Sequence, residues 1–241
     1  MNPYLHLAAD RAAEEIENYI ITNRLQPHDR LPSERKFSEM LGINRITFRE
    51  AIKRLENEHL LYSLKGSGTY IAPHKLRTNT GVNFSFHSYC NANGYKSSSK
   101  VLNIYQTIGT PFICQKLNIP THSSIYVLKR IRYIDSNPAM LETTHIAESL
   151  CPGLNRFDFD QGYPSLFELL SNEYHIYPQK TSYSLGMTYA DTDTSLHLNL
   201  KKGSPLFYFN VTTSTENNQV IEYCQTLKRM DFFGINSDLY P

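Results

Sequence analysis

The chain has 241 residues, of which 40% are hydrophobic and 20% charged, and its 24 Lys and Arg residues nearly balance 23 Asp and Glu residues. This length suits one or two domains with their own cores, and this balance excludes a disordered chain or one that coats nucleic acid by bulk charge. No apolar run of about 18 residues could span a bilayer, and acidic residues interrupt the N-terminal stretch where a signal peptide would lie. We therefore expect a cytoplasmic protein without a membrane partner.

The cysteines support the same compartment. They lie far apart and form no C-x-x-C pair, which favours reduced thiols over a disulfide framework or a zinc site. These cysteines are Cys90, Cys114, Cys151 and Cys224.

The first part of the chain predicts three helices. Apolar residues from Ala9 to Ile20 recur at helical spacing, and Pro27 ends that segment. Ser33 and Asn44 are suitable N-caps for a second and a third helix. The third helix would bury a face made of Phe48, Ala51, Ile52 and Leu55.

Basic charge concentrates around this third helix. Between Arg30 and Arg54 the chain carries seven basic residues against three acidic ones. Because the apolar face points inward, Arg45, Arg49 and Lys53, each four residues apart, share an outer face. Such a helix fits the major groove of DNA, where arginine reaches guanine or phosphate. An arginine face on a helix is more often simply solvated, so the spacing alone leaves both interpretations open.

A hairpin and a linker follow the three helices. Two short strands, Leu60–Leu64 and Thr69–Ala72, flank a turn of sequence KGSG. Its glycines permit close approach to a DNA backbone or groove, and Lys65 adds a positive charge. Three helices and such a hairpin describe a winged helix-turn-helix. The polar stretch from Pro73 to Phe84 has no periodicity and predicts a linker.

The segment from Leu31 to Ile71 resembles the DNA-binding domain of the GntR family of bacterial transcription regulators. The resemblance lies in its start LPSER, its core RITFR and its wing GSGT. It implies double-stranded operator DNA as a partner, contacted by Arg35, Asn44, Arg45, Thr47, Arg49, Lys65 and Gly66. Asn44 and Ile46 replace the commoner residues of the family, so the operator sequence does not carry over from relatives.

The remaining chain predicts a domain of strands and helices. Two strand-like runs, Ile125–Ile134 and Ala139–Ala147, flank a turn of sequence DSNP. Ser165 opens a capping box for a helix that extends to about Tyr174. Further strands are expected at Gln179–Tyr189, Leu206–Ser214 and Val220–Met230, and a further helix at Asp191–Leu200.

Alternation along the first of these strands indicates an anion site. Arg130 and Arg132 would point to one face about 7 Å apart, where they repel unless an anion or a carboxylate lies between them. Glu142 on the paired strand could neutralise them or bind a ligand hydroxyl. The alternative is a surface ladder of cross-strand salt bridges, each contributing roughly 0.2–1 kcal/mol.

The segment KRIRYIDSNPAMLETTHI, from Lys129 to Ile146, resembles the central hairpin of the UTRA domain, found in the HutC subfamily of GntR regulators. The resemblance covers roughly residues 82–240 and implies a chorismate-lyase-like fold that binds small effectors, such as phosphorylated sugars or carboxylates. It implies effector contacts from Phe86, His87, Arg130, Arg132, Glu142, Ser165, Phe167, Glu222 and Tyr223. Phe167 stands where the family commonly has tyrosine.

These patterns and resemblances together predict an α+β chain. A winged helix-turn-helix over residues 1–75 and a linker over residues 76–85 precede a UTRA effector-binding and dimerisation domain over residues 86–241. We expect a homodimeric repressor of transcription whose affinity for a near-palindromic operator is changed by a small anionic effector: a phosphorylated sugar, a phosphonate or a carboxylate. The rival interpretations are a chorismate-lyase-like enzyme fused to a DNA-binding domain, and a regulator that no longer senses an effector. The histidines lack metal-binding spacing, and the sequence contains no G-x-S-x-G motif. We therefore expect no metal site, no cofactor and no catalytic residue.

Overall fold

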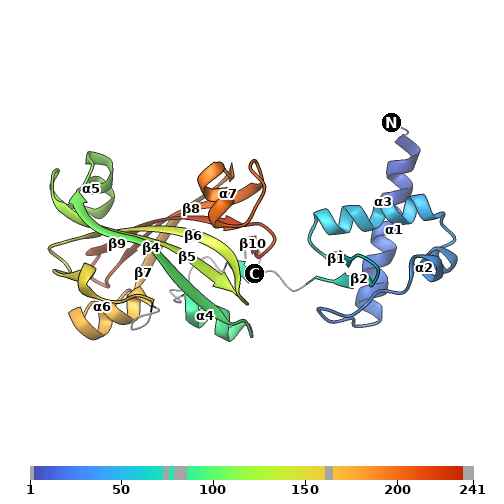
Figure 1. The fold of residues 1–241 in the computed structure, drawn as a ribbon, viewed down its shortest axis with the longest axis horizontal. Helices are drawn as coiled ribbons and strands as arrows, with labels where there is room; N and C mark the ends of the chain where they lie inside the picture. The colour runs from blue at the N-terminus through green and yellow to red at the C-terminus, as the bar shows by residue number, and fades with distance from the viewer. Residues whose placement is uncertain (1–2, 73–75, 79–85, 161–164, 236–241) are drawn as a thin grey trace. The chain divides into compact units, whose positions relative to one another are not determined.

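A computed structural model describes residues 3–72, 76–78, 86–160 and 165–235. The chain divides between Lys75 and Leu76 into two compact units, unit 1 and unit 2. None of the helices in these described ranges is long and apolar enough to cross a membrane. Unit 1 consists of α1 (Pro3–Thr22), α2 (Glu34–Leu41), α3 (Arg45–Asn57) and the antiparallel hairpin of β1 (Leu61–Leu64) and β2 (Gly68–Ile71) (Figure 1).

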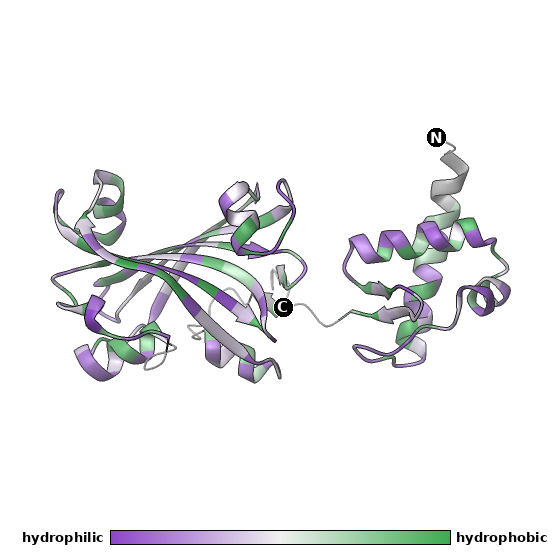
Figure 2. Cartoon of the chain, viewed as in Figure 1, coloured by the Kyte–Doolittle hydropathy of each residue, from purple (hydrophilic) through white to green (hydrophobic). Residues whose placement is uncertain are grey.

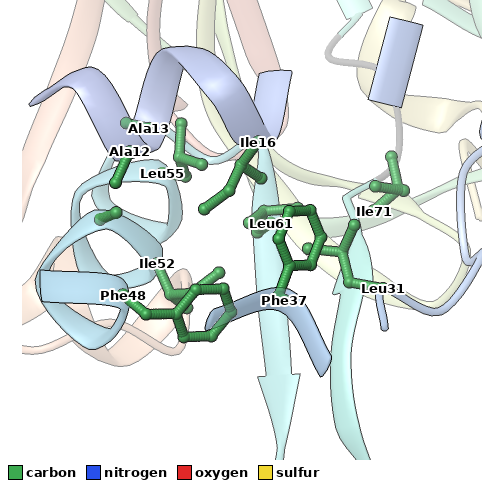
Figure 3. Close-up of a cluster of buried hydrophobic side chains, with 11 residues drawn as sticks. Ala12, Ala13, Ile16, Leu31, Phe37, Phe48, Ile52, Leu55, Leu61 and Ile71 are labelled. Atoms are coloured by element: carbon green, nitrogen blue, oxygen red, sulfur yellow. The ribbon is translucent and has the colours of Figure 1, made fainter. Parts of the chain in front are cut away.

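A single apolar cluster holds the elements of unit 1 together. In Figure 3, side chains from the three helices and the hairpin point toward one another, with Phe37 of α2 among them. The rings of Tyr19 and Phe48 pack on Phe37 with centroid distances of 4.9 and 5.7 Å. The buried members of the cluster are Ala12, Ala13, Ile16, Leu31, Phe37, Phe48, Ala51, Ile52, Leu55, Leu61 and Ile71. The three helices, the buried face of the third and the wing hairpin are thus confirmed.

The expected caps fix where these helices begin and end. Ser33 Oγ accepts a hydrogen bond from the Lys36 amide at 3.4 Å, and Asn44 Oδ1 accepts one from the Thr47 amide at 2.9 Å. Gly42 ends α2 with a φ of +62°, a left-handed conformation that residues with a Cβ adopt at a cost. The turn between α2 and α3 is therefore set by local sequence.

Unit 2 is built on a six-stranded antiparallel sheet with strand order β4-β5-β6-β9-β8-β7. Its strands are β4 (Ser97–Ile108), β5 (Ser124–Ile134), β6 (Asn137–Ala147), β7 (Lys180–Tyr189), β8 (Pro205–Ser214) and β9 (Val220–Arg229). Helices α4 (Phe86–Ala92) and α6 (Leu166–Tyr174) cover one face, and α5 (Pro111–Leu117) and α7 (Thr192–His197) cover the other (Figure 1). A short 3-10 helix, η1, spans Leu154–Arg156. The expected α+β architecture, with a helical unit followed by an antiparallel sheet unit, is confirmed.

Alternation along β5 decides which side chains meet which helix. Tyr126 and Leu128 pack in a cluster with α6, and Ile134 packs in a second cluster with α4. Ile125 and Val127 face α5 instead. Arg130 and Arg132 share the parity of Tyr126, Leu128 and Ile134, so they lie on the α4 and α6 face of the sheet.

Some elements differ from the sequence-based expectation. Within the stretch expected to be a linker, Leu76–Thr78 form β3, which pairs in parallel with β10 (Phe233–Ile235) in unit 2. The rest of that stretch, residues 73–75 and 79–85, lies outside the described residues. Strand β4 escaped prediction because it opens with the polar sequence SSSK and forms an edge of the sheet, where alternation with apolar residues is not required.

All four cysteines are buried free thiols. Burial raises the pKa of Cys90 to about 11 and that of Cys151 to about 12, and it raises the pKa of Cys224 further still. These three thiols are therefore protonated at neutral pH, and all four cysteines are free of disulfides, as their spacing suggested.

Candidate functional site

The outer face of α3 displays the basic residues that its spacing predicted. Arg45, Arg49 and Lys53 are exposed, whereas Phe48, between Arg45 and Arg49, is buried in the core. Figure 2 shows hydrophilic residues along α3 on the side turned away from the core (Figure 2). Arg49 Nε lies 3.1 Å from Glu34 Oε2 of α2, which orients its side chain, while Arg45 forms no ion pair within the described part of the chain.

The other residues expected to contact DNA occupy different environments. Arg35 is exposed on α2, where its Nε lies 3.1 Å from Glu39 Oε1. Asn44 is exposed, but its side-chain oxygen is engaged in capping α3. Thr47 is only 3% exposed, because its position on the helix turns it toward the core. Thr47 therefore lies outside the exposed face of α3, and its contact with DNA stays a prediction.

The wing hairpin presents its tip to solvent. Lys65 and Gly66 are exposed, and Gly66 has a φ of +78° with open space where a Cβ would lie. Gly68 is more constrained: its φ is +138°, and a Cβ there would lie 2.7 Å from Nε of Arg30. The Arg30 guanidinium thus lies directly against the wing, a contact that sequence reasoning missed.

A groove of about 370 Å³ connects these elements in unit 1. It runs between α2, α3 and the wing and is lined by Arg30, Glu34, Arg49, Lys53 and Gly68, among others. Its three basic side chains come from two segments, the loop before α2 and α3, so the surface offers several cations around one concave region. Such a surface can bind an extended polyanion.

A second polar cluster lies within unit 2, on the face of the sheet covered by α4 and α6. The register places Arg130 of β5 opposite Glu142 of β6, and Glu142 opposite Thr226 of β9. Arg130 is 1%, Arg132 6% and Glu142 8% exposed. The cluster is therefore buried, and the alternative of a surface salt-bridge ladder is wrong.

Both arginines converge on one carboxylate oxygen. Glu142 Oε1 accepts hydrogen bonds from Arg130 through Nε at 3.0 Å and through Nη2, and from Arg132 Nη2 at 3.3 Å. Burial alone would raise the pKa of Glu142, but the two guanidiniums outweigh it and lower the pKa to about 2. Two arginines against one ionised carboxylate leave a buried positive charge. Arg130 Nη1 is buried and has no hydrogen-bond partner among the described residues.

A second buried carboxylate lies in the same cluster. Glu222 of β9 is 6% exposed and accepts a hydrogen bond from Thr213 Oγ1 at 3.1 Å. Burial, reinforced by the negative charge of Glu142, raises the pKa of Glu222 to about 7. Thr213 and the two arginines oppose this shift without cancelling it. Glu222 can therefore donate or accept a hydrogen bond near neutral pH.

Aromatic side chains border the arginines. The Arg132 guanidinium carbon lies 5.6 Å from the centroid of Phe86 in α4, and that of Arg130 lies 5.9 Å from Phe159. Phe86 was expected at the site from the resemblance, whereas Phe159 was missed because no local pattern marks the loop that carries it. His87 is exposed and interacts through Nδ1 with Ser97 Oγ at 2.7 Å, which directs it toward β4 rather than toward the arginines.

The residues expected from α6 lie at its start. Ser165 is 6% exposed and caps the helix by accepting a hydrogen bond from the Glu168 amide at 3.3 Å. Phe167 is partly buried and packs against the apolar cluster beneath α6. Both residues therefore belong to the helix that covers the arginine-bearing face.

Tyr223 corrects one sequence-based expectation. Its side chain packs with Ile113 and Leu117 of α5, on the face of the sheet opposite to Arg130. The reason is strand alternation, since Tyr223 and Glu222 are neighbours on β9 and point to different sides. Tyr223 thus does not join the buried polar cluster.

Both halves of the chain match known protein families. Residues 8–71 match the model of bacterial regulatory proteins of the gntR family, and residues 92–233 match the UTRA domain. The chain is 29% identical over 218 residues to the HTH-type transcriptional repressor NagR of Bacillus subtilis, covering 90% of this chain and 88% of NagR. It is 31% identical over 198 residues to the HTH-type transcriptional regulator YurK of the same organism, covering 82% and 81%.

A solved structure shares the fold. PhnF from Mycobacterium smegmatis superimposes with a TM-score of 0.66 and covers 95% of this chain and all of that one, at 21% sequence identity. The likeness extends over both units, so a helical unit and a sheet unit occur together in both proteins.

The raised pKa of Glu222 predicts a pH dependence of stability. Between about pH 4.5, its ordinary pKa, and about pH 7, the folded state holds a proton that the unfolded chain has lost. The free energy of unfolding should therefore fall as the pH rises through this range, by on the order of 3 kcal/mol, and level off above it. Urea titrations of Glu222→Gln across this range should show a correspondingly shallower dependence than the wild type.

The control is Glu216→Gln, in the exposed turn before β9, which should keep the wild-type pH dependence. Burial also lowers the pKa of His145, but both variants retain this residue, so their difference isolates Glu222. Identical pH profiles for the two variants would contradict a raised pKa at Glu222.

Proposed function

The chain belongs to the gntR family of bacterial regulatory proteins, in its HutC subfamily with a UTRA domain, and we propose that it is a transcriptional repressor controlled by a small anionic effector. It is a transcriptional regulator and not an enzyme. The similarity to NagR, a repressor, supports repression rather than activation of transcription. The DNA and the effector that such a regulator meets both lie in the cytoplasm, where we place this protein.

The observation that carries the effector proposal is the buried cluster around Arg130. Burying charge and leaving an N–H group without a partner both destabilise a protein unless something compensates. Among the described residues Arg130 Nη1 has no such partner, and both guanidiniums converge on the single carboxylate of Glu142. A phosphate, phosphonate or carboxylate bound there would supply both the acceptor and the charge. The alternative interpretation, a regulator that no longer senses an effector, does not explain this buried charge.

We place DNA on the basic surface of unit 1. In this arrangement α3 enters the major groove, with Arg45 and Arg49 toward base edges or phosphates, and Lys65 at the wing approaches the backbone. Arg30 and Arg35 lie beside this surface and would add phosphate contacts.

A second copy of the chain is the partner that the free edge of the sheet favours. Edge strand β7 has no charged residue after Lys180, and it exposes a row of large side chains at every second position: Tyr183, Leu185, Met187 and Tyr189. An uncharged edge with such a row promotes pairing unless it is covered. Two antiparallel copies of β7 centred on Leu185 would pair symmetrically, and this would tie two DNA-binding units to one palindromic site.

Effector and operator would then be coupled through the dimer. An effector that binds one arrangement of the two DNA-binding units better than another shifts the population toward it. The coupling is reciprocal, so operator DNA changes effector affinity by the same factor as the effector changes operator affinity.

Substitutions on α3 test the DNA surface. Arg45→Ala and Arg49→Ala should each weaken binding by about 1–3 kcal/mol if the side chains contact bases. The measurement is fluorescence anisotropy with a duplex that the wild type selects from random DNA. Arg11→Ala, an exposed change of the same charge on α1, should have little effect. Wild-type affinity in the Arg45→Ala and Arg49→Ala double variant would refute this recognition helix.

Inorganic phosphate tests the effector cluster without knowledge of the effector. Phosphate should raise the melting temperature of the wild type, because binding to the folded state alone stabilises it. Arg132→Ala should lose this increase relative to its own phosphate-free value. Arg156→Ala, an exposed arginine in η1, should keep it and thus measure the general salt effect of phosphate. An equal increase in Arg132→Ala and Arg156→Ala would exclude an anion site at the cluster.

Charges on β7 test the dimer. A variant with Leu185→Lys and Met187→Lys should dissociate to monomers in sedimentation experiments and bind the palindromic duplex more weakly, since two new like charges would meet across the interface. Leu196→Lys, at a highly exposed position of α7, is the matched control and should remain dimeric. A dimer that survives both β7 charges must be built elsewhere.

A further inference from the structure

A third cation, not anticipated from the sequence, lies on the same face of the sheet as the two arginines. The register aligns Arg132 of β5 with Met140 of β6, and Met140 with Lys228 of β9. Strand alternation therefore gives Lys228 the same orientation as Glu142 and Thr226, toward α4 and α6. Lys228 is thus two strands away from Arg132 in one row across the sheet.

The Lys228 ammonium is held between two aromatic rings. Its Nζ lies 4.4 Å from the ring centroid of Phe209 in β8 and 5.0 Å from that of Phe233 in β10. Within the described ranges no carboxylate lies within ion-pair distance of it. Burial lowers the pKa of Lys228 to about 8, and the neighbouring Cys224 and Glu142 side chains oppose this decrease only in part. The aromatic faces thus replace some of the lost hydration, but they supply no counter-charge.

The distance across the sheet separates this cation from the arginine pair. Neighbouring strands lie about 4.8 Å apart, so the backbones of β5 and β9 are about 10 Å apart across the intervening β6. The arginine pair and Lys228 are therefore positioned to hold two separate acidic groups of one ligand, on either side of Met140 in β6. Among the described residues, these three cations share the face with one ionised carboxylate, that of Glu142, while Glu222 is protonated.

We propose that Lys228 is a specificity-determining residue of the effector pocket, which binds a second acidic group of the effector a few bonds away from the group held by Arg130 and Arg132. The inference rests on the proposed function, because it takes the arginine pair as the first anion site. It narrows the effector to compounds with two separated acidic groups, such as a phosphorylated sugar acid. A purely structural residue between two phenylalanine rings would be better apolar, since a partly buried cation with no counter-charge among the described residues lowers stability.

Matched pairs of small acids test this proposal on the full chain. Each α,ω-dicarboxylate from malonate to pimelate is compared with the monocarboxylate of equal length, and 6-phosphogluconate is compared with glucose 6-phosphate. At pH 7 the wild type should bind the doubly acidic member of at least one pair tenfold or more tightly in calorimetry. Lys228→Met should reduce this preference to less than twofold and leave the affinity for the singly acidic member unchanged.

Two further variants separate a binding role from a structural one. Lys228→Arg keeps the charge and should retain the preference. Lys129→Met removes a lysine on the opposite face of the sheet, where it pairs with Asp193 at 3.1 Å, and should also retain the preference. Melting temperatures recorded alongside report any general loss of stability in each variant.

A pH series on the wild type needs no substitution at all. The preference for the doubly acidic member should decline between pH 7.5 and pH 9.5, as the Lys228 ammonium loses its proton, and Lys228→Arg should keep it at pH 9.5. The other charged and titratable groups that face this region are Arg130 and Arg132, Glu142 and Glu222, and the thiols of Cys90 and Cys224. The pKa values of about 2 for Glu142 and about 7 for Glu222 lie below that range, and burial raises those of Cys90, to about 11, and of Cys224 above it.

The outcomes distinguish this proposal from the function on which it rests. If the wild type prefers no doubly acidic member, or if none of the probes binds, the assignment of Lys228 is overturned. It is also overturned if Lys228→Met keeps the preference or if the preference is constant to pH 9.5. If phosphate binding depends on Arg132 in each of these cases, the anion site remains and only the role of Lys228 falls.

Discussion

The register between β5 and β6 is the constraint on which the sensing half of the molecule depends. It places Arg130 directly opposite Glu142, so the charge that would otherwise prevent burial of two arginines is partly neutralised from the adjacent strand. A shift of one residue would turn both arginines toward α5 and α7 and bury apolar side chains among polar ones. The ion pairs and the apolar clusters on either side of them therefore specify the same alignment of strands.

The two units hold their cations in different surroundings. Unit 1 keeps its cations on the outside of a short helix, where they remain hydrated until a polyanion approaches. Unit 2 keeps its cations under two helices, where water is scarce and each charge acts strongly on its neighbours. Recognition of a long duplex and of a small molecule thus take place in surroundings of very different polarity within one chain.

Local sequence patterns were enough to predict much of this arrangement. The caps at Ser33 and Asn44 and the alternation around Arg130 each depend only on neighbouring residues. Contacts between distant segments were beyond such patterns. Phe159 reaches Arg130 from the loop after η1, and Lys228 joins the face of Arg132 because the sheet brings β5, β6 and β9 together. Tyr223 was misplaced because a family position was followed without its strand parity. Thr47 was likewise assigned by motif, although the helical face that carries it is turned inward.

The reactivity of the buried thiols reports local opening of the structure. Cys224 lies in the row of side chains that carries Glu222 and Thr226, and Thr144 Oγ1 donates a hydrogen bond to its sulfur at 3.4 Å. Burial keeps this thiol protonated, and the nucleophile in alkylation and oxidation is the thiolate. Oxidants that modify exposed cysteines therefore spare it. Its alkylation rate measures how often the sheet separates from α4 and α6, which cover it.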